Sequence, residues 1–107
     1  MKEIKVFESE KELQEKVLLN SIICKIIENR SICFTQTKTS FFAFENKCPH
    51  YSVPLDTANI NFKGEVVCSL HAYRFNLENG WETTGKKLCL KRYPIEIKAE
   101  GVFVKLL

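Results

Sequence analysis

Long apolar runs are missing from this chain of 107 residues. None reaches the roughly 18 consecutive apolar residues that a membrane-spanning helix requires. Residues 1–6 alternate charged with apolar side chains, so the apolar stretch of a secretory signal is missing as well. We therefore expect no membrane partner and a cytoplasmic location.

Glycine, proline and surplus charge are also scarce. Four glycines and three prolines leave no glycine-rich phosphate loop and no low-complexity linker. The net charge of +3 is too small to predict nucleic-acid binding, and the basic stretch at residues 86–92 is interpreted as a solvated surface. Length and composition fit one domain, residues 1–107.

Only two histidines are present, and each stands beside a cysteine. Two thiolates and two imidazoles from two loops predict one metal site with four ligands. With both histidines used there, no Ser-His-Asp triad remains, so we expect no catalytic residues and no small-molecule substrate. The two motifs, separated by 17 residues, are Cys48-Pro49-His50 and Cys68-Ser69-Leu70-His71.

The ligand types alone leave the metal open. A mononuclear zinc site can also use two cysteines and two histidines. A Cys2His2 zinc-binding or redox-sensing module is therefore an alternative.

Most of the remaining chain is typical of short strands, which predicts an all-β fold. Residues 22–28, 31–36 and 41–45 are rich in Ile and Phe and are separated by polar breaks, the first at 29–30, as in antiparallel hairpins. Residues 93–98 and 102–106 alternate apolar with polar side chains. One short helix is expected after Ser9, where a capping box precedes Leu13, Val17 and Leu18 at helical spacing.

Residues 46–85 have a different character. They contain both metal-ligand motifs, few apolar runs and the strong turn signal Asn79-Gly80. We expect a loop-rich subdomain here, inserted into the β framework.

The motifs and their neighbours resemble the signature of Rieske ferredoxins. Pro54-Leu55 follows the first motif and Phe75-Asn76-Leu77 follows the second, in the order and with the gaps of that family over residues 40–107. The resemblance implies a Rieske-type antiparallel β sandwich or barrel whose inserted subdomain binds one [2Fe–2S] cluster. It also implies the ligands: Cys48 and Cys68 on the inner iron, and His50 and His71 on the outer iron near the surface.

The resemblance implies an electron carrier rather than an enzyme. Such a protein passes one electron at a time from a reductase to a terminal oxygenase or reductase, as the ferredoxin of a ring-hydroxylating oxygenase does. A small subunit like that of nitrite reductase is the alternative setting. Partners would meet the histidine end, where we expect an apolar tip flanked by Lys47 and Arg74; its members are Tyr51, Val53, Pro54, Leu70 and Tyr73.

The other three cysteines are expected to be free thiols, because cytoplasmic proteins seldom hold disulfides. Cys24 and Cys33 stand in apolar strands and are interpreted as small buried hydrophobes. Cys89 has no assigned role, although Leu88 and Cys89 occupy the place of a proline-rich loop that often covers the cluster in the family. Trp81 is interpreted as a packing residue.

The reduction potential should lie near the lower end of the Rieske range, which runs from about −150 to +300 mV. High-potential members of the family carry a disulfide between the ligand loops and hydroxyl groups near the cluster. Val53, Leu70 and Phe75 stand at matching positions here and supply neither. Redox titration of the purified protein measures the potential, and a value well above zero would refute this reasoning.

Overall fold

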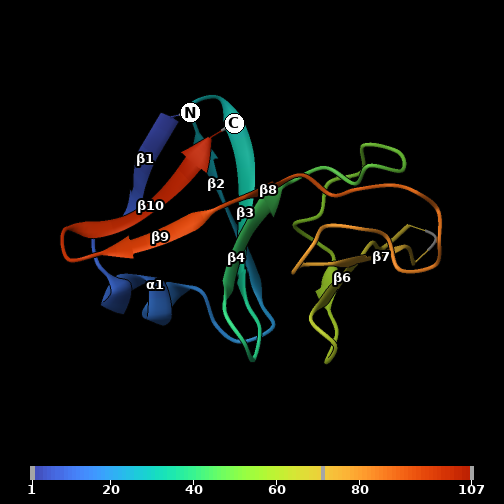
Figure 1. The fold of residues 1–107 in the computed structure, drawn as a ribbon, viewed down its shortest axis with the longest axis horizontal. Coiled ribbons are helices and arrows are strands. Elements are labelled where there is room, and N and C mark those ends of the chain that lie inside the picture. The colour runs from blue at the N-terminus through green and yellow to red at the C-terminus, as the bar shows by residue number, and fades with distance from the viewer. Residues whose placement is uncertain (1, 71, 107) are drawn as a thin grey trace.

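The computed structural model describes residues 2–70 and 72–106, so the predicted ligand His71 lies outside the described residues. Strands dominate the described residues and form three antiparallel sheets (Figure 1). One short helix, α1, accompanies them there. The first sheet has the order β1-β10-β9, the second β2-β3-β4-β8 and the third β5-β6-β7. The bounds are β1 Lys2–Phe7, α1 Glu10–Lys16, β2 Ile22–Ile27, β3 Arg30–Gln36, β4 Phe41–Glu45, β5 Asn59–Ile60, β6 Glu65–Val67, β7 Arg74–Asn76, β8 Arg92–Tyr93, β9 Ile95–Lys98 and β10 Gly101–Leu106.

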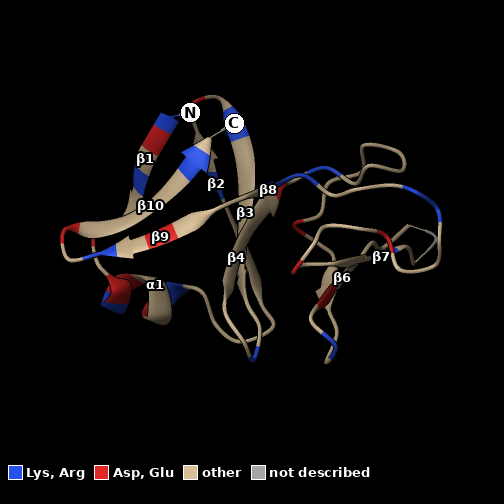
Figure 2. Ribbon diagram, viewed as in Figure 1, with Lys and Arg blue, Asp and Glu red and all other residues tan. Residues whose placement is uncertain are grey.

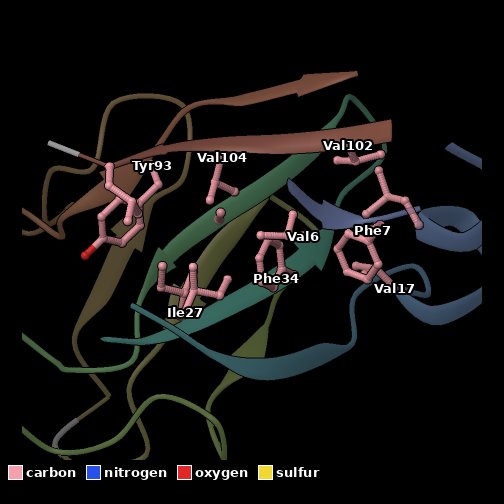
Figure 3. Close-up of a cluster of buried hydrophobic side chains, with 12 residues drawn as sticks. Val6, Phe7, Val17, Ile27, Phe34, Tyr93, Val102 and Val104 are labelled. Atoms are coloured by element: carbon pink, nitrogen blue, oxygen red, sulfur yellow. The ribbon is translucent and has the colours of Figure 1, made fainter. Parts of the chain in front are cut away.

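The first two sheets face each other across the larger hydrophobic core. Figure 3 shows side chains of β1 and β10 meeting those of β2 and β3. The rings of Phe7 and Phe34 join the two sheets edge to face, with centroids 5.3 Å apart. At the margin of this core, Lys25 donates a hydrogen bond to the Val6 carbonyl and lies 4.0 Å over the Phe7 ring. The predicted antiparallel sandwich is confirmed.

Helix α1 closes one end of the sandwich. The Ser9 hydroxyl caps it by accepting a hydrogen bond from the Glu12 amide, as the sequence predicts. Leu13 and Val17 are fully buried against the core. Leu18 was expected on the same face, but this prediction is wrong: its side chain is 58% exposed. The helix ends at Lys16, and the backbone is already extended at Val17, so helical spacing no longer applies one residue later.

The turn between β2 and β3 lies one residue earlier than the polar break in the sequence suggested. Ile27 pairs with Arg30, so Glu28 and Asn29 form a two-residue turn. Both have positive φ, at 52° and 66°, as a type I′ turn requires. This turn fixes the register of the whole hairpin.

Strands β3 and β4, the centre of the second sheet, are covered on both faces. Along β3, Ile32 and Phe34 point into the sandwich core, whereas Cys33 points into a second hydrophobic cluster. Along β4, Ala43 belongs to the first core and Phe44 to the second. The two-residue period of a strand thus sends alternate side chains into two different cores.

The second core lies between this sheet and the loop-rich segment that connects β4 to β8. That segment contains the small sheet β5-β6-β7, which Figure 1 shows beside the sandwich. The buried members of the second core include Leu55, Val66 and Phe75, together with the two motif cysteines. The predicted loop-rich insertion is confirmed. Among the described residues, no helix has both the length and the apolar character needed to cross a membrane, and the cytoplasmic location stays a prediction.

Candidate metal centre

The two metal-ligand motifs begin loops of the same geometry. The Cys48 amide donates a hydrogen bond to the Val53 carbonyl at 2.7 Å, and the Cys68 amide donates one to the Tyr73 carbonyl at 2.8 Å. In both loops the residue four positions after the cysteine is left-handed, with φ of 60° at Ser52 and 53° at Ala72. A left-handed conformation costs a non-glycine residue about 1–2 kcal/mol. The surrounding structure therefore imposes this turn at both motifs.

The motif cysteines meet in the second core. Cys48 is fully buried and Cys68 is 1% exposed. Burial raises the pKa of the Cys48 thiol, and its hydrogen bond with the Cys68 thiol raises it further. The backbone amides of His50 and Tyr51 donate to the Cys48 sulfur and act in the opposite direction. Two aimed N–H groups suit a sulfur that carries negative charge, as a metal-bound thiolate does.

His50 is held between the two loops by aromatic contacts. Its ring centroid lies 4.0 Å from that of Tyr51 and 4.0 Å from that of Tyr73. The side chain is half-buried, and its Nδ1 atom is buried completely. An imidazole with Nδ1 turned inward has the orientation that a ligand of a buried metal needs.

The described residues thus include three of the four predicted ligands. Within residues 2–70 and 72–106, no group of three or more His, Cys, Asp or Glu side chains is close enough to hold a metal. What the structure brings together is the thiol pair, with His50 following Cys48 in the same loop. Thiol and imidazole donors are ligand types that both zinc and a Rieske-type iron–sulfur cluster accept, so the donor set fits a metal centre.

Asn46 anchors the first loop to the sandwich. Its Oδ1 accepts hydrogen bonds from the amides of Leu55 at 2.6 Å and Asp56 at 2.9 Å. Its Nδ2 donates to the Ser31 hydroxyl on β3 at 3.1 Å, and its own amide donates to the Ser31 carbonyl. The sequence marked Asn46 only as part of a polar break. An asparagine at the end of a strand and ahead of a loop is the signal that was available.

Gly80 and Glu82 shape the loop that lies beside Tyr73. Gly80 has φ of +85°, and a Cβ atom there would lie 2.7 Å from the Leu90 carbonyl oxygen, so the turn requires glycine. Burial raises the pKa of Glu82, but hydrogen bonds from the Thr84 hydroxyl and from the amides of Lys86, Thr84 and Arg74 outweigh it, and the pKa is lowered overall. Glu82, which the sequence left without a role, braces this loop.

Other expectations for this loop meet mixed outcomes. Leu88 packs against the second core, in line with its expected shielding role. Cys89 is exposed, with its sulfur 3.9 Å from the Asn79 carbonyl oxygen, and does not belong to that core. Trp81 was interpreted as a packing residue, but its side chain is 52% exposed, so this prediction is wrong. Its backbone bridges to Cys89, which leaves the ring at the surface.

Comparisons with known proteins agree on one family. The family model described as "Rieske [2Fe-2S] domain" matches residues 3–94. A ferredoxin subunit of 3-phenylpropionate/cinnamic acid dioxygenase from Shigella boydii serotype 4 (strain Sb227) is 29% identical over 72 residues. That alignment spans 62% of this chain and 63% of the relative, less than two thirds of its length.

Two solved structures have the same fold. The ferredoxin of carbazole 1,9a-dioxygenase from Nocardioides aromaticivorans IC177 superposes with a TM-score of 0.80 at 16% identity, covering 100% of both chains. A protein described as a nitrite reductase NADPH small subunit superposes with a TM-score of 0.76 at 14% identity, covering 99% of this chain and 100% of the other.

Replacing Asn46 with alanine should loosen the first loop. Two amides lose their acceptor, which we expect to lower the free energy of unfolding by about 1–3 kcal/mol. Hydrogen exchange followed by mass spectrometry should speed up in peptides covering residues 48–58 and stay unchanged in β9 and β10. Asn59→Ala, at an exposed site on β5, is the matched control. Equal exchange rates in the two variants would contradict the anchoring role of Asn46.

Proposed function

Because the chain belongs to the Rieske [2Fe–2S] domain family, we propose that it carries single electrons between a reductase and a terminal oxygenase or reductase. The observation that carries the proposal is the pair of buried, mutually hydrogen-bonded cysteines at the start of two loops of equal geometry. Family membership favours the iron–sulfur cluster over the zinc module. The chain is proposed to work as one domain whose residues 46–85 form the cluster-binding subdomain.

The ligand assignment follows the motifs. The Cys48 and Cys68 thiolates would bind the inner iron, and the imidazoles of His50 and His71 the outer iron. Their burial and inward donors support the assignment for Cys48, Cys68 and His50. For His71, which lies outside the described residues, the support is its spacing from Cys68. Bound to two thiolates and two neutral imidazoles, the cluster is neutral when oxidised and accepts one electron more readily than an all-cysteine cluster does.

The side chains of this chain prepare the site for that chemistry. The second core excludes water from both thiolates, with Phe75 and Leu55 fully buried beside them. The amides of His50 and Tyr51 donate to the Cys48 sulfur, so they stabilise its negative charge. The rings of Tyr51 and Tyr73 pack against His50 and fix its orientation.

The histidine end of the site is accessible and apolar. Tyr51 is 64% exposed and Leu70 is 37% exposed. Pro54 is exposed as well, and Val53 is half-buried. An apolar tip of this kind fits a small transient interface, below about 1,200 Å² of buried surface. We propose that the electron partner docks here.

The charge distribution favours an acidic surface on that partner. Residues 46–92 hold seven Lys and Arg against four Asp and Glu, whereas the rest of the chain holds nine of each. The excess comes from Lys86, Lys87, Lys91 and Arg92, which follow the cluster-binding subdomain and have no acidic residue among them. Figure 2 shows basic residues along the connections to this region and on its outer loop. Such an arrangement steers association with a partner of opposite sign.

The oxygenase setting is favoured by the curated relative, a ferredoxin subunit of a dioxygenase. The structural similarity to a nitrite reductase small subunit keeps the reductase setting as the second candidate. In both settings the chain supplies electrons and transforms no substrate.

The purified protein should be coloured and contain two iron and two acid-labile sulfide per chain. Cys48→Ser should abolish the chromophore, because an inner ligand is lost. Cys89→Ser should keep it, since that thiol is exposed and outside the second core. Iron and sulfide analysis with visible absorption measures both. Colourless protein holding one zinc after expression with adequate iron would sink the proposal.

Leu70→Asp should slow electron exchange with the physiological partner by about tenfold, which corresponds to about 1.4 kcal/mol. The reason is a charge placed in the centre of an apolar interface, and the visible spectrum should not change. Phe62→Asp is the matched control, because Phe62 is 79% exposed but lies before β6, at the end of that strand opposite to Cys68. Stopped-flow kinetics measures the rates. Equal slowing by both variants would exclude the tip as the docking site.

A further inference from the structure

Cys24 and Cys33 lie directly opposite each other on neighbouring strands. Cys24 of β2 pairs with Cys33 of β3 in antiparallel register. Their sulfur atoms are 2.7 Å apart, against about 2.05 Å in a formed disulfide. The sequence interpreted both residues as small hydrophobes, nine positions apart, and gave no sign of this contact.

The position of the pair in the ladder suits a cross-strand disulfide. The pair that closes a two-residue hairpin, here Ile27 and Arg30, exchanges both backbone hydrogen bonds, and such pairs alternate with non-hydrogen-bonded ones. Counting from the turn makes Cys24 and Cys33 a non-hydrogen-bonded pair. Consistent with this count, the Ser31 carbonyl accepts from Asn46 on the β4 side rather than from β2.

This geometry also indicates a reducible bond. Cα atoms of a non-hydrogen-bonded pair are about 4.5 Å apart, at the short end of the 4.4–6.8 Å that disulfides span. A disulfide near the limit of its range is reduced more readily than a relaxed one. The site therefore suits reversible oxidation better than a permanent cross-link.

The two thiols differ in access. Cys33 is fully buried in the second core, whereas Cys24 packs against that core and is partly exposed. Only Cys24 can meet a reagent from solution. Burial raises the pKa of both thiols, and the nearby Asp56 carboxylate raises it further, so exchange is slower than at an unhindered surface thiol.

From these contacts we infer that Cys24 and Cys33 form a second redox site, a dithiol that low-molecular-weight disulfides oxidise reversibly to a disulfide between β2 and β3. The Cys24 thiolate attacks one sulfur of the small disulfide, forms a mixed disulfide and releases one small thiol. The Cys33 thiolate then attacks the Cys24 sulfur, closes the cross-strand bond and releases the second small thiol. Two electrons and two protons pass from the cysteines to the small disulfide, and excess small thiol reverses both steps.

The pair shares the second core with the proposed metal ligands but does not use them. Cys33, Cys48 and Cys68 are buried members of one cluster, and the sulfur contact of Cys24 is with Cys33. Closing the bond shortens one contact that already exists. Oxidation of the pair should therefore leave Cys48 and Cys68 bound to the cluster and its visible absorption unchanged.

The test uses the full-length protein as isolated, equilibrated with oxidised and reduced glutathione over a range of ratios. Free thiols are trapped by acid quench and alkylation, and the peptides are mapped by mass spectrometry. With rising oxidised glutathione, we expect a peptide pair joined through Cys24 and Cys33 that is lighter by two hydrogens. Reduced glutathione should remove it. The linkage should be absent in Cys24→Ser and Cys33→Ser and retained in Cys89→Ser.

Several results would overturn the inference. One is complete alkylation of Cys24 and Cys33 in the wild-type protein at every ratio of oxidised to reduced glutathione. This result does not depend on the folding of any variant. Another is Cys24 trapped only as a mixed disulfide with glutathione. A third is a Cys48–Cys68 linkage that forms with loss of colour while Cys24 and Cys33 stay free. The mapped linkage does not depend on the cluster, so failure of this inference and failure of the proposed electron carrier are distinguishable.

Discussion

The burial of both faces of strands β3 and β4 is the constraint on which the rest of the structure depends. Alternate residues of β3 and β4 enter two cores, so Phe34 holds the sandwich together while Phe44 supports the metal-ligand loops. A one-residue slip in register would exchange the two sets and spoil both cores at once. The two-residue turn at Glu28 and Asn29 pins that register.

The same sheet links the proposed metal site to the framework. Asn46 follows the end of β4 and donates a hydrogen bond to Ser31 on β3. It also accepts hydrogen bonds from two backbone amides on the far side of the first loop. Each ligand loop then closes on its own cysteine amide with a left-handed residue near its end. Rigid strands thus hold the two loops in place and bring the Cys48 and Cys68 thiols together.

Features that depend on neighbouring residues in the sequence were predictable. The Cys-x-His and Cys-x-x-His motifs, the Ser9 cap and the two-residue period of β9 and β10 each depend on neighbours in the chain, and each indicated the correct element or family. Features that depend on distant segments were not. The contact of Cys24 with Cys33 needs the exact turn position, and the exposure of Leu18 and Trp81 depends on where a helix and a bridge end. The hydrogen bonds of Glu82 come from a loop whose path no short pattern records.

In the proposed site two thiolates hold one iron and two imidazoles hold the other. Mössbauer spectroscopy of the iron-57-labelled protein tests it most directly, because thiolate and imidazole donors give an iron different electronic surroundings. We expect two iron environments in equal amounts, with the electron added on reduction localised on one of them. A single iron environment in the Mössbauer spectrum, both before and after reduction, would contradict this assignment.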